Sequence, residues 1–261
     1  MLRENGSCDD CAYPQRVRAY SYKPDPRFHG EGPLYLGLEL EVIVPSDRHN
    51  DAVSVATEQL GRLGYLKNDS SIRPMGFEIV THPLSYRFAL EQFPWPLLGE
   101  LVALGCWTDS TVGLHVHASR AGFDSPAHIY RWMKLLYRNE NEVSALARRR
   151  SRYAPFDRAA RARARDTAKG HKHAVGLDRY QAINPHPRDT LELRIFASSL
   201  DVGQVQAALA FTAASIDYTR RLGVPDIRAG AWEWAVFAAW VGGRPEYAAL
   251  TAEMEALACA C

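Results

Sequence analysis

Hydrophobic and polar residues alternate with a period of two in several short segments of the chain. The clearest segment is 34–45, in which every second residue from Leu38 to Val44 is aliphatic. Successive side chains of a strand point to opposite faces, so this alternation predicts a strand with one apolar face. The same period predicts further strands at Gly76–Leu84, Gly113–Ser119 and Thr190–Ser199.

A hairpin is expected around the last of these strands. The short segment Arg179–Asn184 precedes it, and Pro185–Asp189 between them is typical of a turn. Within the strand, strict alternation predicts that Phe196 shares the face of Glu192 and Arg194.

A helical period predicts the elements between and after the strands. Pro94 and Pro96 interrupt the second helix, because proline breaks a helix interior. Strands interleaved with and followed by helices predict an α+β fold, with a curved, mostly antiparallel sheet and helices packed on one face. The predicted helices are Asp51–Leu63, Ser85–Leu104, Ser125–Arg149, Asp201 to about Leu222, and two more through Leu257.

Overall charge adds little to this picture. The 261 residues include 31 basic and 30 acidic side chains, a net charge of +1, which favours neither nucleic acid nor a membrane surface as partner. The chain has no apolar run of about 18 residues or more, and its N-terminus lacks the apolar region of a secretory signal. We therefore expect a cytoplasmic protein with no membrane partner.

The polar faces of the predicted strands carry the candidate chemistry. Carboxylates dominate these faces, together with two histidines, and little basic charge compensates them. Carboxylates that share one concavity repel each other, so they are either protonated or bind cations. Carboxylate oxygens favour Mg²⁺, and imidazole is also compatible with Mn²⁺ or Zn²⁺. The residues are Glu39, Glu41, Glu78, His115, His117, Glu192 and Arg194, with Asp69 in the loop before the second of these strands.

Five segments together resemble the glutamine synthetase-like carboxylate–amine ligases, and within them the smaller amidoligases. They cover residues 34–201 in the order and roughly the spacing of that family. The resemblance implies the glutamine synthetase catalytic fold, with residues 34–261 as the catalytic domain. Residues 1–33 are polar and rich in Pro and Gly, which predicts an extended N-terminal arm, and the helical period predicts C-terminal helices over 201–261. The segments are YLGLELE (35–41), NDSSIRPMGFEIVTHPL (68–84), GLHVHAS (113–119), RYQAIN (179–184) and TLELRIFASSLD (190–201).

The resemblance also implies two Mg²⁺ sites. Glu39, with His115 and Glu192, would hold the metal that binds the nucleotide phosphates. Glu41 would hold a second metal near the substrate, completed by Asp69 and Glu78. The family commonly has Asp-Gly-Ser where this chain has Asp69-Ser70-Ser71. Serine in place of glycine at position 70 disturbs the loop only if the backbone there must adopt a positive φ.

The remaining implied roles concern ATP. Arg194 would contact the transferred γ-phosphoryl group, and Arg179 would be another phosphate or substrate contact. His117 would lie behind the metal ligands or contact the substrate. The implied activity is an ATP-dependent ligation of a carboxylate to an amine through an acyl phosphate.

Residues 150–176 are rich in Arg, Lys and His, with Ala between them. One interpretation is a flap that brings Lys169, Lys172 or an Arg of this segment onto the ATP phosphates, and another is a solvated helix and loop. A third is a contact with a large anionic partner, such as an acidic peptide or nucleic acid. Nucleic acid is the weaker choice, because aromatic residues are not interleaved with the charges.

The cysteines permit a zinc site. Cys8 and Cys11 form a CxxC half-site, and Cys259 and Cys261 form a CxC pair. A structural zinc site needs four ligands, so the termini would have to meet, or His29 would have to complete the site. The alternative is free thiols on an arm and a tail. Cys106 lies among apolar residues and is expected in the core.

Other functions remain open at this point. One alternative is a non-catalytic module on the same scaffold that binds a nucleotide or a peptide. A phosphagen-kinase-like phosphotransferase would transfer phosphate to a guanidine and stop there. A metal-dependent hydrolase would consume no ATP. The carboxylate and amine substrates and the oligomeric state are not specified by these patterns.

Overall fold

The computed structural model describes residues 16–259, which form an α+β fold around one seven-stranded sheet. The strand order is β1-β3-β4-β2-β5-β7-β6, and every neighbouring pair is antiparallel except β1 and β3. The strands are β1 (Val17–Arg18), β2 (Leu36–Ile43), β3 (Gly64–Lys67), β4 (Gly76–Thr81), β5 (Gly113–Ser119), β6 (Ile183–Asn184) and β7 (Thr190–Ala197).

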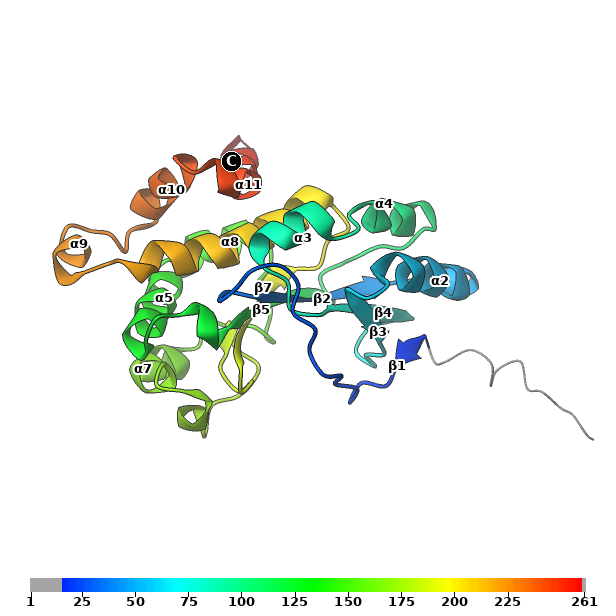
Figure 1. Ribbon diagram of the computed structural model, residues 1–261, viewed down its shortest axis with the longest axis horizontal. Helices are drawn as coiled ribbons and strands as arrows, with labels where there is room; N and C mark the ends of the chain where they lie inside the picture. Colours follow the sequence, from blue (N-terminus) through cyan, green and yellow to red (C-terminus); the bar gives the residue numbers. More distant parts are fainter. Residues whose placement is uncertain (1–15, 260–261) are drawn as a thin grey trace, which may run out of the picture.

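Helices cover one face of this sheet. Figure 1 views the sheet nearly edge-on and shows α2, α3, α4 and α8 on one side, with α10 and α11 beyond α8. The α-helices are α2 (His49–Leu60), α3 (Tyr86–Gln92), α4 (Pro96–Ala103), α5 (Pro126–Arg138), α6 (Glu140–Leu146), α7 (Arg158–Thr167), α8 (Val202–Arg220), α9 (Val224–Arg228), α10 (Trp234–Gly242) and α11 (Ala248–Cys259). The predicted fold class, with a mostly antiparallel sheet and helices on one face, is confirmed.

The core lies between the sheet and these helices. Leu40 of β2 pairs with Ile79 of β4 and Leu114 of β5, and all three side chains are buried. From the helical layer, Phe211 of α8 packs edge-on against Phe196 of β7. Each fully buried side chain of this kind contributes about 1.5–3 kcal/mol. One face of each central strand is thereby committed to packing, and its other face is left for polar residues.

Two helix predictions differ from the structure. The expected helix Ser125–Arg149 is divided at Asn139, whose Nδ2 donates to the backbone oxygens of Leu135 (2.7 Å) and Trp232 (2.9 Å). This side chain satisfies a carbonyl of the last turn of α5, which favours ending the helix there. After α8 the chain forms three α-helices rather than two, because the short α9 begins at a Gly223-Val224-Pro225 turn. The expected break near Pro94 is confirmed.

The sheet is wider than predicted by two strands. β3 and β1 have only four and two residues, too few for a periodic pattern to be visible. β1 lies within the predicted N-terminal arm and pairs in parallel with β3. The sheet edge therefore extends beyond β4, which brings Lys67 beside Glu78.

The predicted orientation of Phe196 is wrong. Leu114 pairs with Phe196 and Val116 with Leu193, so one extra residue of β7 lies opposite β5. This bulge shifts the alternation and turns Phe196 into the core, where it is 4% exposed. Arg149 Nη1 donates to the backbone oxygens of Arg194 (3.3 Å) and Phe196 (3.5 Å), which supports the bulged backbone.

Within residues 16–259, no helix combines the length and the apolar character that a membrane span requires.

Candidate functional site

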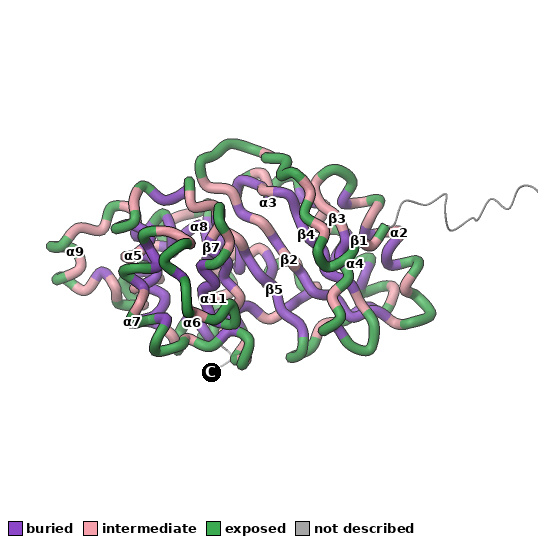
Figure 2. The backbone as a smooth tube through the Cα atoms, turned by 90° about the horizontal axis from the view of Figure 1, so that it is seen from below, coloured by how far each residue is buried: buried purple, intermediate pink, exposed green. Residues whose placement is uncertain are grey.

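A cleft of about 2290 Å³ lies against the sheet face that the helices leave uncovered. Figure 2 views the molecule from this side and shows buried segments of β2, β4 and β5 at the centre with exposed segments around them. The lining comes from the chain around residues 20–41, the loop at 69–71, and the segments 149–153 and 177–194. The polar faces of the central strands form its floor.

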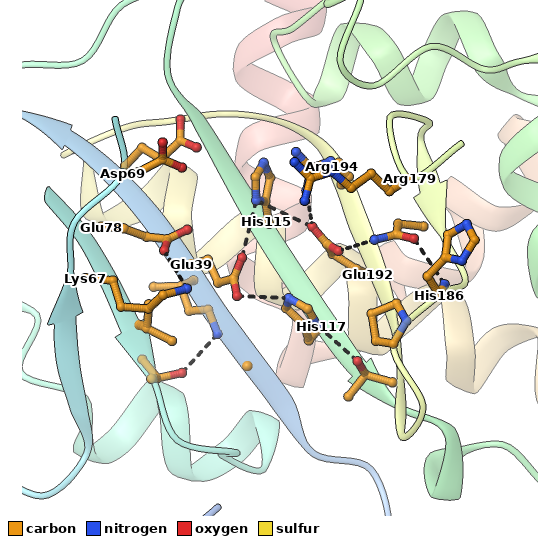
Figure 3. A pocket seen from close by; sticks show the side chains of 18 of the residues that line it. Glu39, Lys67, Asp69, Glu78, His115, His117, Arg179, His186, Glu192 and Arg194 are labelled. Atoms are coloured by element: carbon orange, nitrogen blue, oxygen red, sulfur yellow. Dashed lines mark hydrogen bonds and ion pairs between the residues drawn. The ribbon is translucent and has the colours of Figure 1, made fainter. Parts of the chain in front are cut away.

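Strand register brings the predicted residues of the floor together. Glu39 pairs with His115, Glu41 pairs with Glu78, and His117 pairs with Glu192. Paired residues on one face lie about 4.5–5.5 Å apart at Cβ, so these side chains meet directly. Figure 3 shows the side chains converging from β2, β4, β5 and β7, with Glu39, Glu78, His115, His117 and Glu192 labelled.

Glu39 occupies the centre of this floor. Its Oε1 lies 3.3 Å from His117 Nε2, and its Oε2 lies 3.5 Å from His115 Nδ1. Two groups of possible metal ligands share it: Glu39, His117 and Glu192, and Glu39, Glu78 and His115. In each group the ligand atoms lie within 4.8 Å of one another. His117 thus lies among the possible metal ligands.

Glu192 is held by its neighbours on both oxygens. Arg194 Nη1 donates to Oε1 at 2.5 Å, and Asn184 Nδ2 donates to Oε2 at 2.6 Å. His115 Nδ1 lies 3.6 Å from the same Oε1. Burial raises the pKa of Glu192, but His117, His115 and Arg194 outweigh it and hold the pKa below its usual value. Glu192 is therefore a fixed, ionised carboxylate.

Glu78 and Glu41 are in a different electrostatic state. Burial and the nearby Glu39 raise the pKa of Glu78 to about 8, although Lys67 Nζ lies 3.3 Å from its Oε2. Burial also raises the pKa of Glu41, whose Oε2 accepts the Gly113 N–H at 2.7 Å. Without a further cation nearby, the carboxyl groups of Glu78 and Glu41 are therefore protonated more readily than ordinary glutamates.

Glu39 and His117 form an ion pair. Burial raises the pKa of Glu39, but His117 and His115 outweigh it and hold the pKa well below its usual value. Burial lowers the pKa of His117, but Glu39 reverses that effect and raises the pKa to about 9. The pair is charged at neutral pH.

Asp69 lines the cleft at the loop before β4, as predicted, and its Oδ1 accepts the Ser71 N–H at 2.7 Å. Among the described non-glycine residues, only Arg148 has a positive φ. Ser70 is therefore unstrained where the resembling family commonly has glycine.

The two predicted arginines lie on the same side of the cleft. Arg179 Nη2 donates to Tyr180 Oη (2.6 Å), and its Nη1 donates to Tyr20 Oη (3.3 Å). The Arg194 guanidinium lies 5.8 Å from the centre of the Tyr180 ring. No sequence pattern singles out Tyr20 or Tyr180 as a site residue.

The structure does not bring the two predicted lysines to the cleft. Lys169 Nζ pairs with Asp166 Oδ1 at 2.7 Å, just after α7, and neither Lys169 nor Lys172 is among the residues that line the cleft. The Ala/Arg part of the basic segment is helical, as α7, and packs on α5.

Sequence reasoning missed three residues of the floor. Lys67 lies on a strand too short to predict. Asn184 contacts Glu192 only after folding, and Arg149 comes within electrostatic range of Glu41 only after folding. Gly113 lies directly against the guanidinium of Arg149, since a Cβ at this glycine would lie 2.0 Å from Arg149 Nη1. No local pattern marks any of these contacts.

The zinc prediction falls outside what the structure describes, since Cys8, Cys11 and Cys261 lie beyond residues 16–259 and the side chain of Cys259 is likewise not described. Cys106 is buried in the core, as expected, and burial raises its pKa to about 11.

Comparison with known proteins gives a distant likeness in structure. No family model matches the chain, and no curated protein matches it. A solved structure of a GmaS/ADP complex, in its conformation 1, aligns with a TM-score of 0.46 at 17% identity, over 86% of this chain and 67% of that chain. The functional argument therefore rests on the geometry of the cleft.

Proposed function

We propose that this protein is an ATP-dependent carboxylate–amine ligase that works through an acyl phosphate, as the resemblance to the amidoligases within the glutamine synthetase-like superfamily implies. The observation that carries the proposal is the convergence of Glu39, Glu78, Glu192 and two histidines on one floor, with Arg194 beside them. A charged cluster of this composition favours divalent cations and phosphate oxygens.

The residues of the floor fit a divalent cation such as Mg²⁺, with Mn²⁺ as an alternative. Two overlapping groups of carboxylate and imidazole ligands are present. Buried His115 Nδ1 and His117 Nε2 face the Glu39 carboxylate but make no hydrogen bond of good geometry within residues 16–259. A metal bound there would displace the proton of His117. Bound there, the metal would neutralise charge on phosphate oxygens.

The protein's own residues have defined tasks in this reaction. Arg194 is fixed by Glu192 and would bind the transferred phosphoryl group, with Arg179 contacting phosphate or substrate further out. The substrate carboxylate oxygen attacks the γ-phosphorus of ATP, and ADP leaves. The amine nitrogen then attacks the acyl carbon, inorganic phosphate leaves, and the amine proton passes to a base.

The test measures ADP release with Mg²⁺ and with EDTA, using hydroxylamine to trap the acyl phosphate from a pool of amino acids and acidic peptides. We expect Mg²⁺-dependent ADP release together with a hydroxamate. Glu39→Gln and Arg194→Gln should each reduce both by about 100-fold or more, because each removes a group that binds the developing charge. Glu91→Gln, an exposed glutamate of α3 that pairs with Arg87, is the matched control and should keep full activity.

Three outcomes would contradict the ligase. ADP release that persists in EDTA removes the metal-dependent mechanism. A stable phosphorylated product without hydroxamate indicates a phosphagen-kinase-like phosphotransferase. Nucleotide binding without any turnover indicates a binding module.

A further inference from the structure

The cleft has an acidic floor and a basic wall. We use "basic wall" for Arg150, Arg152, Arg179 and Arg188, which are exposed and line one side of the cleft. Arg149 and Arg194 lie deeper, next to the carboxylates. The cations of the wall therefore lie between the floor and solvent.

The wall belongs to a region of concentrated positive charge. Residues 148–188 contain twelve Arg or Lys against three Asp, a net charge of +9 in a chain whose total is +1. No ion pair is found for Arg150, Arg152 or Arg179 within residues 16–259, and Arg188 has only the exposed Asp189 at 3.9 Å. Such a surface attracts anionic partners and repels cationic ones.

The cleft and its charge exceed what a nucleotide requires. Small-molecule sites occupy about 300–1,000 Å³, whereas this cleft measures about 2290 Å³. The deeper Arg194 and Arg149, with Arg179 and a metal, suffice for the phosphates of one nucleotide. Arg150, Arg152 and Arg188 are then left for another anionic ligand.

Tyr153 and Tyr180 hold two arginines of the wall, Arg152 and Arg179, in place. Arg152 lies 4.9 Å from the ring centre of Tyr153 and donates to its hydroxyl at 2.8 Å. Arg179 lies 4.7 Å from the ring centre of Tyr180. Side chains that are ordered before binding lose less freedom on binding, so the wall is prepared for a ligand.

We propose that the basic wall binds an extended acidic segment of a polypeptide, and that one carboxylate of this segment is the group that reacts at the floor. The proposal rests on the proposed ligase function and names the chemical class of its carboxylate substrate. Arginine suits this ligand because its guanidinium binds a carboxylate through two parallel hydrogen bonds.

Two observations favour a polypeptide over nucleic acid. A strand of nucleic acid would bring a continuous row of phosphates across a floor of carboxylates, whereas an acidic peptide can place single residues over it. Stacking of bases along the wall requires free aromatic faces there, and the protein's own arginines already lie over Tyr153 and Tyr180, the two tyrosines next to wall arginines in the sequence. Only the peptide also supplies a carboxylate to be ligated.

The experiment measures fluorescence anisotropy of three labelled ligands of equal length without ATP: an oligoglutamate peptide, an oligoglutamine peptide and single-stranded DNA. The cleft variant carries Arg150→Gln, Arg152→Gln and Arg188→Gln. The matched control carries Arg158→Gln, Arg161→Gln and Arg165→Gln, three exposed arginines of α7 that do not line the cleft. Both variants lose the same charge from the same region.

We expect the glutamate peptide to bind the wild type and the glutamine peptide not to bind. The cleft variant should weaken binding by about tenfold or more, and the control by about twofold or less, since only the cleft arginines contact the ligand. Equal loss in both variants, tighter binding of DNA, or no binding of the glutamate peptide would overturn the proposal.

A parallel assay separates this proposal from the ligase itself. ADP release and hydroxamate formation are measured with Mg²⁺ and small amino acids as the only carboxylates. If these occur while the glutamate peptide does not bind, the acidic-peptide proposal fails and the ligase stands. If the peptide binds but no carboxylate supports ADP release, the ligase function fails instead.

Discussion

Lys67 places a permanent positive charge beside the carboxylate floor. Its Nζ lies 3.3 Å from Glu78 Oε2 and 5.2 Å from the ring centre of Tyr20, and its side chain is 11% exposed. Glu78 belongs to one of the two candidate ligand groups, with Glu39 and His115. A lysine at this distance competes electrostatically with any divalent cation that binds there.

Lys67→Met should therefore tighten Mn²⁺ binding by about tenfold or more, because the substitution removes a repulsive charge and keeps the length of the side chain. Binding is measured by the electron paramagnetic resonance signal of free Mn²⁺, at pH about 9 so that protons compete less for the carboxylates. Lys23→Met, at an exposed lysine of the same cleft, is the control and should bind as the wild type does. An affinity for Lys67→Met equal to that of the wild type would show that Lys67 does not oppose the metal.

At the scale of single elements, the shape of strand β7 determines the orientation of Arg194. The bulge opposite β5 breaks the strand alternation, so that Leu193 and Phe196 both face the core while Arg194 remains on the floor beside Glu192. Arg149 bonds the carbonyls of the bulge. Bulges often redirect a side chain in this way at functional sites.

The helical layer depends on a buried histidine between α5 and α8. His128 Nε2 lies 2.8 Å from the carbonyl oxygen of Ile216, and its Nδ1 accepts the Asp124 N–H at 3.2 Å. One nitrogen therefore donates and the other accepts, which only the neutral imidazole permits. Burial lowers the pKa of His128 below its usual value.

The stability of the fold should consequently fall as the pH drops below about 6.5, the usual pKa of histidine. There the unfolded chain takes up a proton at His128 that the folded chain does not, so unfolding is favoured by at most about 1.4 kcal/mol per pH unit. Thermal unfolding between pH about 5 and 7.5 measures this effect. The slope should flatten in His128→Gln and persist in the exposed control His173→Gln; an unchanged slope in His128→Gln would assign the effect to other groups.

At the scale of the whole molecule, the floor gathers like charges from strands that are distant in sequence. Glu39, Glu78 and Glu192 come from β2, β4 and β7, and they are held together by the packing on the opposite face of the sheet. Their repulsion is a cost to the folded state that a bound cation relieves. Folding and metal binding should therefore be linked.

Addition of Mg²⁺ at about 100 times its dissociation constant should stabilise the protein by about 2.7 kcal/mol. This corresponds to a rise in melting temperature of several degrees, roughly 2–4 °C per kcal/mol for a chain of this size. Glu39→Gln should abolish the rise, because both candidate ligand groups include Glu39. Glu91→Gln should retain it, and an equal rise in Glu39→Gln would place the metal elsewhere.

Much of the architecture follows from local patterns. The alternation in β2, β4 and β5 predicted which face is apolar, and the same alternation placed Glu39, Glu41, Glu78, His115 and His117 on the other face. These assignments hold because a strand with one buried face cannot slip by one residue without exposing its apolar side. Residue type and period were therefore sufficient to predict which side chains of β2, β4 and β5 face the core.

Only the tertiary structure determined the contacts that the periodicity of the sequence does not predict. The two short strands β1 and β3, the bulge of β7, and the positions of Lys67, Arg149 and Tyr20 in the cleft all depend on which segments become neighbours. Local propensity is set by each residue and its near neighbours along the chain. Pairing between strands, a break in register and the charge around a carboxylate are set by long-range packing, so the sequence specified the chemistry of the floor while the fold decided which cations face it.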